Sequence, residues 1–151
     1  MSRNRRYAAL LIPAALVWMG FLVEDRKAAA QGQETFKARL ALVPSDLKTR
    51  PDITGSGAAT AVLNGGKVTI TGKFEGMKTA ATMAQLHSGI ATGVRGTVVH
   101  DLTVDKATSG SISGSFDLNP QQVDALRKGK MYIQLHSEKA PEGNLWGWLL
   151  K

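Results

Sequence analysis

Three histidines are the residues of this chain with the clearest capacity for chemistry. Two of them, His87 and His136, stand in two copies of one tetrapeptide, Gln-Leu-His-Ser, at residues 85–88 and 134–137. The third, His100, lies in the segment Val-Val-His-Asp-Leu. Histidine is the commonest metal ligand and an acid or base near neutral pH. The repeated tetrapeptide therefore suggests a metal site, a catalytic pair or a repeated structural unit.

The repetition extends beyond the four residues. The pattern Ile-(Ser/Thr)-Gly-x-Phe precedes each copy, at residues 70–74 and 112–116. A glycine-containing, strand-like segment follows each copy, at residues 95–99 and 146–150. Matched features in the same order are typical of an internal repeat. We therefore interpret the chain as a pseudo-repeat of two three-stranded units.

Strand alternation predicts the side to which each histidine points. Successive side chains of a strand face opposite sides, so Leu86 and His87 separate, as do Leu135 and His136. The leucines belong to the apolar set and are predicted to face the core. Each histidine then shares the outer face with the glutamine two residues before it, near a strand end. Whether the fold brings His87 and His136 together decides the metal hypothesis.

The pattern along the rest of the chain predicts an all-β fold. Asn64-Gly65-Gly66 between two apolar runs is a strong hairpin signal. A short helix is expected near 119–128, because Asn119 can cap it and Pro120 suits its first turn. Eight short strands without a βαβ rhythm indicate an antiparallel sandwich or barrel. The expected strands are 35–43, 58–63, 67–74, 79–87, 97–104, 110–118, 131–136 and 144–150.

The N-terminal segment has the order of a secretory signal peptide. Arg3, Arg5 and Arg6 precede an apolar run from Ala8 to Val23, and small residues follow at 28–30. We expect residues 1–30 to be this signal, residues 31–34 a linker and residues 35–151 one domain. The charged residues 24–27 keep an uncleaved membrane anchor as an alternative, and that anchor is the only membrane contact expected. The predicted location is extracytoplasmic, either periplasmic or secreted.

Composition excludes several classes of function. The chain has no cysteine, which removes disulfides, cysteine-ligated zinc and thiol catalysis. Its net charge of +7 comes from scattered basic residues rather than a stripe interleaved with aromatics, so nucleic acid is not an expected partner. An exported domain of this kind must be held together by its hydrophobic core.

The ordered set of segments resembles the chordin-type (CHRD) domain family, in its bacterial exported type, over essentially all of residues 36–150. The resemblance implies an extracytoplasmic Greek-key-like sandwich, immunoglobulin-like or superoxide-dismutase-like. In chordin such domains accompany modules that bind secreted growth factors. The family often has His-x-His where this chain has Gln85 and His87. The segments that carry the resemblance are Val68 to Gly76, Ala84 to Gly89, Tyr132 to Ser137 and Gly143 to Leu149.

Metal binding is one functional hypothesis. His87, His100 and His136 are the candidate ligands, and copper or zinc would suit imidazole. Gln85 removes one imidazole from the family pattern. Each histidine is also explained as a polar residue near a strand end, so a protein without a cofactor is the first expectation.

Catalysis has less support from the sequence. There is no Gly-x-Ser-x-Gly elbow and no acidic pair at a suitable spacing. Ser88 follows His87 directly, and strand neighbours face opposite sides. We therefore expect no enzyme activity and name no catalytic residue.

Binding is the first functional prediction. Alternation places Trp146 and Trp148 together on the outer side of the last strand, while Leu145, Gly147 and Leu149 point inward. Two outward indoles form an apolar patch, and such patches mark contacts unless a helix or loop covers them. We expect an interaction or structural module that binds an unknown protein or a second copy through this C-terminal strand. Copper or zinc binding by the histidines is the alternative.

Overall fold

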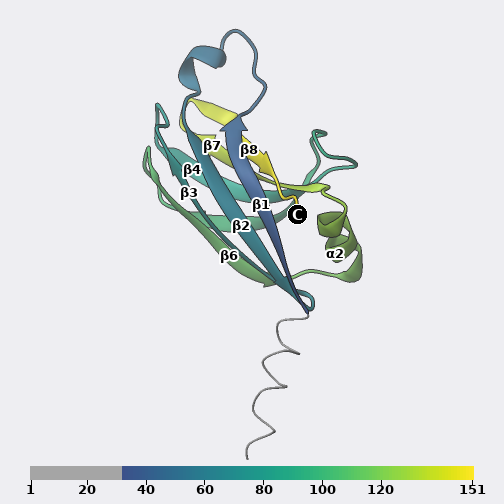
Figure 1. Cartoon of the computed structure of the whole chain (residues 1–151). Coiled ribbons are helices and arrows are strands. Elements are labelled where there is room, and N and C mark those ends of the chain that lie inside the picture. The colour runs from purple at the N-terminus through teal and green to yellow at the C-terminus, as the bar shows by residue number, and fades with distance from the viewer. Residues whose placement is uncertain (1–31) are drawn as a thin grey trace, which may run out of the picture. The chain divides into compact units, whose positions relative to one another are not determined.

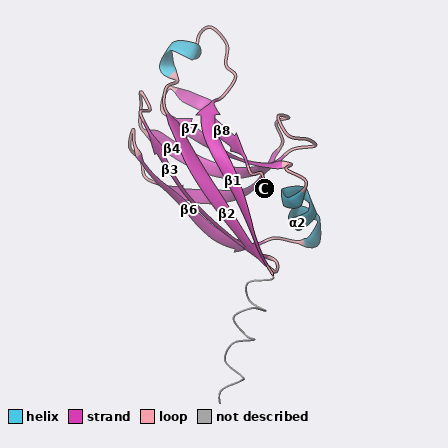
Figure 2. Ribbon diagram, viewed as in Figure 1, coloured by secondary structure: helices cyan, strands magenta, loops and turns pink. Residues whose placement is uncertain are grey.

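Eight antiparallel strands close into one barrel in the computed structural model, which describes residues 32–151 (Figures 1 and 2). The strand order around the barrel is β1-β2-β3-β6-β5-β4-β7-β8. The elements are β1 (Gln33–Leu42), the 3-10 turn η1 (Arg50–Asp52), β2 (Ser56–Asn64), β3 (Lys67–Glu75), β4 (Ala81–Ser88), β5 (Thr97–Val104), β6 (Gly110–Asp117), α2 (Pro120–Arg127), β7 (Met131–Ser137) and β8 (Ala140–Trp148).

The barrel is made of two four-stranded layers. Strands β1, β2, β3 and β6 pair along eight or nine residues at each junction. Strands β5, β4, β7 and β8 form the other layer. Two short ladders join the layers, Thr103–Val104 with Ile112–Ser113, and Ala41–Leu42 with Leu145–Trp146. The all-β antiparallel prediction is confirmed, and the two expected layers are joined into a closed barrel.

Local sequence signals explain the turns and the helix. Gly65 adopts a positive φ of 62° in the β2–β3 turn, a conformation that glycine tolerates without steric cost. The Asn119 side chain accepts a hydrogen bond from the Gln122 amide at 2.9 Å. The Gln122 side chain accepts one from the Asn119 amide at 3.0 Å, which completes a capping box. The predicted hairpin and helix are confirmed.

Three strands start earlier than the sequence predicted, and one of them, β2, begins at Ser56 rather than at residue 58. Strand β1 begins at Gln33, inside the expected linker, and Glu34 forms ion pairs with Arg127 and Lys151. Strand β8 begins at Ala140 because it forms a tight hairpin with β7, in which Ala140 pairs with Ser137. The predicted signal segment, residues 1–30, lies outside the described residues. In the part of the chain that the structure describes, no helix is long and apolar enough to span a membrane.

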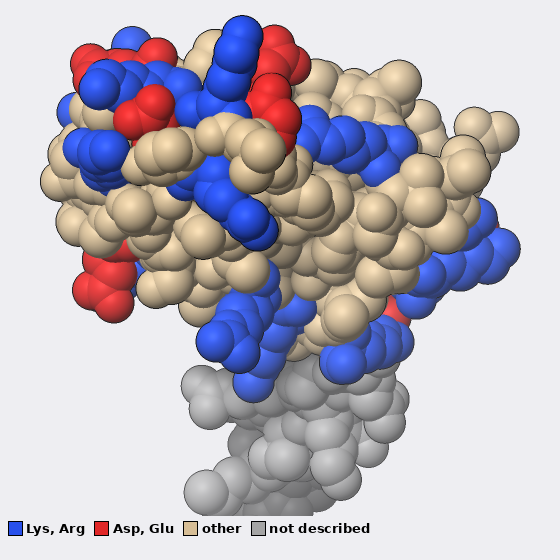
Figure 3. Space-filling view, turned by 90° about the horizontal axis from the view of Figure 1, so that it is seen from above, with Lys and Arg blue, Asp and Glu red and all other residues tan. Residues whose placement is uncertain are grey.

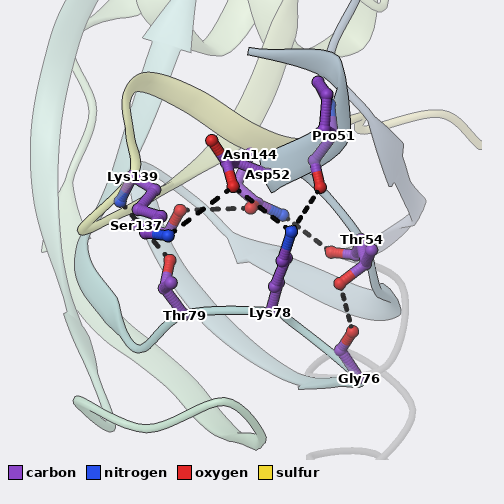
Figure 4. A network of polar contacts seen from close by, with 9 residues as sticks. All are labelled: Pro51, Asp52, Thr54, Gly76, Lys78, Thr79, Ser137, Lys139 and Asn144. Atoms are coloured by element: carbon purple, nitrogen blue, oxygen red, sulfur yellow. Dashed lines mark hydrogen bonds and ion pairs between the residues drawn. The ribbon is translucent and has the colours of Figure 1, made fainter.

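The inward-facing side chains fill the barrel, and its ends are covered. Helix α2 adds Val123 and Leu126 to the core beside one end (Figure 1). The β1–β2 connection covers the other end, where Ile53 is buried. Asn144 ties that connection to β8 by donating to the Thr54 carbonyl at 2.9 Å (Figure 4).

A polar network secures the same connection from a second side. Lys78 donates to the Pro51 carbonyl at 2.9 Å and lies 3.3 Å from an Asp52 carboxylate oxygen (Figure 4).

The surface charges are unevenly distributed in the view from above. Most of the acidic side chains in this view lie toward one side, whereas the basic side chains are spread across it (Figure 3).

Each copy of the predicted repeat pairs with its counterpart. Strand β3 pairs with β6, and Thr71 lies opposite Ser113, the second residues of the two Ile-x-Gly-x-Phe patterns. Strand β4 pairs with β7, and Gln85 lies opposite Gln134. The two Gln-Leu-His-Ser copies are therefore antiparallel neighbours in one layer.

Candidate functional site: the outer face of β4, β7 and β8

The histidines and tryptophans share one side of the β4–β7–β8 layer. The register places His87, Tyr132 and Trp148 in one row across the three strands. Gln85, Gln134 and Trp146 form the next row. Their neighbours along the strands, such as Leu86, Leu135 and Leu145, point into the core and are fully buried. We use the term outer face for six side chains: His87, Tyr132, Gln134, His136, Trp146 and Trp148.

Four of the six outer-face side chains are covered rather than exposed, namely His87, Tyr132, Gln134 and His136. All seven residues of β7 are buried, and His87 and His136 each expose only 7% of their surface. The segment between β4 and β5 lies over His87 and Tyr132, since the Gly96 amide donates to the Tyr132 hydroxyl at 3.0 Å. Alternation therefore predicted the correct side for both histidines but not their burial.

Tyr132 is the centre of an aromatic cluster. Its ring stacks on His87 with centroids 4.9 Å apart, and the Trp148 ring lies 4.4 Å away. Trp146 meets Tyr132 edge-on at 5.8 Å and Trp148 at 6.0 Å. Both tryptophans are half-buried, whereas Tyr132 is fully buried. The predicted outward direction of the two indoles agrees with this geometry.

Arg95 lies over Trp146. Its guanidinium carbon lies 5.6 Å from the centre of the Trp146 ring, a cation–π distance. The same guanidinium donates to the Glu142 carbonyl at 3.2 Å, so it links the β4–β5 segment to the β7–β8 hairpin. Sequence analysis missed Arg95, because nothing in the sequence shows where a loop arginine will rest. It also left out Tyr132, which alternation does place in the same set as His136.

Backbone carbonyls fix the orientation of both imidazoles. The Nδ1 of His87 donates to the Gly96 carbonyl at 3.3 Å, and the Nδ1 of His136 donates to the Pro141 carbonyl at 2.7 Å. Because each Nδ1 carries the proton, each neutral ring keeps a lone pair on Nε2. Such a carbonyl contact is the usual support behind a metal-binding histidine.

Two buried acceptors of the outer face have no hydrogen-bond partner among the described residues. They are the Nε2 of His87 and the Oε1 of Gln134. The Gln134 amide nitrogen donates to the Glu142 carbonyl at 3.0 Å and lies 3.5 Å from the Nε2 of His136. Unpartnered buried acceptors are uncommon and costly.

Burial lowers the pKa of His87 below its ordinary value of 6.5. The hydrogen bond to Gly96 opposes this shift, while the charges of His136 and Arg95 add to it. A histidine with a lowered pKa is neutral at physiological pH, which leaves its Nε2 free to accept a bond.

The structure brings two of the three histidines to one face but does not place them side by side. His87 lies opposite Tyr132, whereas His136 lies opposite Met83, four residues further along β4. Four residues of strand correspond to about 13 Å. The paired glutamines lie between the two histidines. No group of three or more histidine, cysteine or acidic side chains among residues 32–151 is arranged to hold a metal ion.

His100 lies on the other side of the layer. It pairs with Leu86, which points into the core, and its ring stacks on Phe116 with centroids 4.0 Å apart. Val98, two residues before His100 on β5, does not share its side. The register shifts between Leu86 and His87, so Val98 pairs with His87 and is 50% exposed. Such a register shift is typical of a β-bulge, and beyond the bulge the side chains of the strand face the opposite sides from those that simple alternation predicts.

Asp101 of β5 is bonded to a glutamine. The Asp101 carboxylate accepts a hydrogen bond from Gln85 at 2.8 Å. This contact lies on the outer side of the layer, whereas His100 lies on the inner side.

The sequence model of the CHRD domain matches residues 36–149. This span contains most of β1 and every later strand, together with α2. The chain belongs to the CHRD domain family. No curated protein and no solved structure matches it. In this CHRD domain the outer face combines two tautomer-fixed histidines, a buried glutamine and two half-exposed tryptophans.

Proposed function

We propose that this CHRD domain is a non-catalytic interaction or structural module of an exported protein. Its contact surface is the outer side of the β5–β4–β7–β8 layer, with Trp146 and Trp148 as anchors. The partner is a protein, and a second copy of this chain is the partner that can be tested directly. The order of basic, apolar and small residues in the N-terminal segment supports export.

One observation carries the proposal, namely the concentration of exposed apolar side chains around this face. Seven large apolar side chains are exposed among the described residues, and four of them lie on or beside it. Met83 and Val98 point outward from β4 and β5, and Ile90 and Val94 belong to the segment that covers the face. Contiguous exposed apolar surface next to aromatic and arginine side chains is typical of contact sites.

The proposal predicts that the two tryptophans contribute to assembly. We expect W146A/W148A to shift the sedimentation coefficient of concentrated samples toward that of the monomer. L47A is the matched control, because Leu47 is 84% exposed on the β1–β2 connection, away from this face. Sedimentation velocity measures both variants, and circular dichroism checks that they fold. If W146A/W148A and the parent chain sediment alike at every concentration, the proposal is wrong.

Copper or zinc binding is a second candidate function, favoured by the unpartnered Nε2 of His87. An ion there would have His87, Gln134 and His136 as neighbours, all on the outer face, but not His100. Binding by both histidines would require their rings to converge over Gln134. Isothermal titration of the chain with Cu²⁺ or Zn²⁺ tests this. We expect H87Q/H136Q to abolish the heat and H100Q to retain it, while a parent chain without heat at neutral pH contradicts the candidate.

A further inference from the structure

The outer surface of the other layer has a groove over the start of β2. The register aligns Arg39, Ala58, Lys73 and Ser111 in one row across β1, β2, β3 and β6. In this row Ala58 of β2 is small, whereas its neighbours Arg39 and Lys73 are long. A shallow, open hollow of about 660 Å³ lies over this row and the ends of the strands next to it. Strand β1, which carries Arg39, also pairs with β8, which carries the two tryptophans.

Unpaired basic side chains border the groove. Arg39 and Lys73 stand on its two sides, and Lys37 lies two residues from Arg39 on the same strand. All three are exposed, and none takes part in an ion pair within residues 32–151. Glu75 lines the hollow, and the Asp105 carboxylate at its edge accepts a hydrogen bond from the Ser111 amide at 2.7 Å. Three cations against these two carboxylates leave the groove with an excess of positive charge, which suits an anionic ligand.

The spacing of the cations suits an extended ligand rather than one small ion. Lys37 and Arg39 are separated by about 7 Å along β1. Arg39 and Lys73 are separated by two strand spacings, about 10 Å. Hydroxyl groups fill the positions between and beside them, because Thr60, Thr71 and Ser113 align with Lys37, and Ser111 aligns with Arg39.

We propose that this groove binds an anionic polysaccharide. Its acidic groups would pair with Arg39, Lys73 and Lys37, and its hydroxyls would bond to the serine and threonine hydroxyls. A single-stranded nucleic acid suits the groove less well, because the two rows hold no aromatic side chain on which bases could stack. A membrane surface also suits it less well, because Leu150, which pairs with Lys37, is the one exposed large apolar side chain in line with these rows among residues 32–151. The residues that line the groove are not those of the proposed protein contact.

The test measures binding of fluorescent dextran sulfate to the purified chain by anisotropy at about 50 mM NaCl, where charge pairs are weakly screened. We expect R39Q/K73Q to weaken binding about tenfold, which corresponds to two lost charge contacts. The matched control is K48Q/R50Q, which removes the same charge from two exposed residues of the β1–β2 connection. We expect the control to bind within about twofold of the parent chain.

A second variant keeps the test decisive if R39Q/K73Q fails to fold. A58E places a carboxylate on the exposed floor of the groove and should weaken binding without removing any cation.

Several outcomes would overturn the proposal. Equal losses of affinity in R39Q/K73Q and K48Q/R50Q would do so, as would neutral dextran binding as tightly as dextran sulfate. Single-stranded DNA binding more tightly than dextran sulfate would assign the groove to nucleic acid. Inorganic sulfate competing as well as the polymer, at equal sulfate concentration, would reduce the site to one for a single anion. Each of these results contradicts the polysaccharide.

Discussion

Leu86 and His87 are adjacent in the sequence, face opposite sides of β4 and are both buried. The side of each residue could be predicted, because alternation is a property of the strand itself. The burial of His87 could not, because residues 95–96 of a loop provide its cover. The same limit applies to Gln134, whose cover comes from the hairpin carbonyl of Glu142.

The buried His87 makes stability depend on pH. Its pKa in the folded chain is lower than 6.5, so between that pKa and 6.5 the unfolded chain binds more protons than the folded one. The free energy of unfolding should therefore fall as the pH drops through 6.5, and this loss should level off below the folded pKa. Urea unfolding between about pH 5 and pH 7 measures the slope, which H87Q should reduce.

The carboxyl groups with lowered pKa titrate in a different window. Hydrogen bonds from Arg127 and Lys151 lower the pKa of Glu34, so its contribution is lost only below 4.5. A parent chain and H87Q with identical slopes above pH 5 would show that His87 is not the group responsible.

At the scale of elements, the signals encoded within a few residues were the most reliable. The β2–β3 turn and the cap of α2 both follow from side chains and backbone preferences inside the turn itself. The start of β8 could not be predicted, because its first residues look like a loop and become a strand only through pairing with β7. Strand β7 is buried on both faces, and its outer face is covered by segments that are distant from it in the sequence. Its full burial could therefore not be predicted either.

The capping box of α2 gives a prediction for one element. N119A removes the side chain that accepts from the Gln122 amide and should lower the free energy of unfolding by about 1 kcal/mol. Q121A is the control, because Gln121 is exposed on the same turn and makes no capping bond. Denaturant unfolding compares the two. A loss in Q121A as large as that in N119A would show that the cap is not the cause.

At the scale of the whole molecule, the closure of the barrel is the feature that sequence analysis left open. A sandwich and a barrel of eight strands have the same local patterns. They differ here in two short ladders, each of two residue pairs, and in the isolated bridge between Lys37 and Leu150. Which strands belong to which layer follows from how the strands pair with one another, and this pairing cannot be read from the sequence of any single strand.

Gly147 tests the closure between β1 and β8. A Cβ atom at this position would lie 2.5 Å from the Arg39 carbonyl oxygen and 2.9 Å from a Leu40 side-chain carbon. G147A should therefore separate the strands and destabilise the fold by about 1–3 kcal/mol, the usual cost of overpacking. G32A is the control, because nothing lies within 4 Å of the added atom. Thermal unfolding compares the two. A fully stable G147A would contradict the tight contact.

The most direct test of the central claim follows the two tryptophans during association. In a W18F background they are the only tryptophans of the chain. Acrylamide quenching of their fluorescence is measured alongside sedimentation from about 1 to about 100 µM, a range that covers weak self-association. The account predicts that quenching falls as the sedimentation coefficient rises, because both indoles become covered. Association with unchanged quenching, or a chain that stays monomeric throughout with constant quenching, would contradict self-association through Trp146 and Trp148.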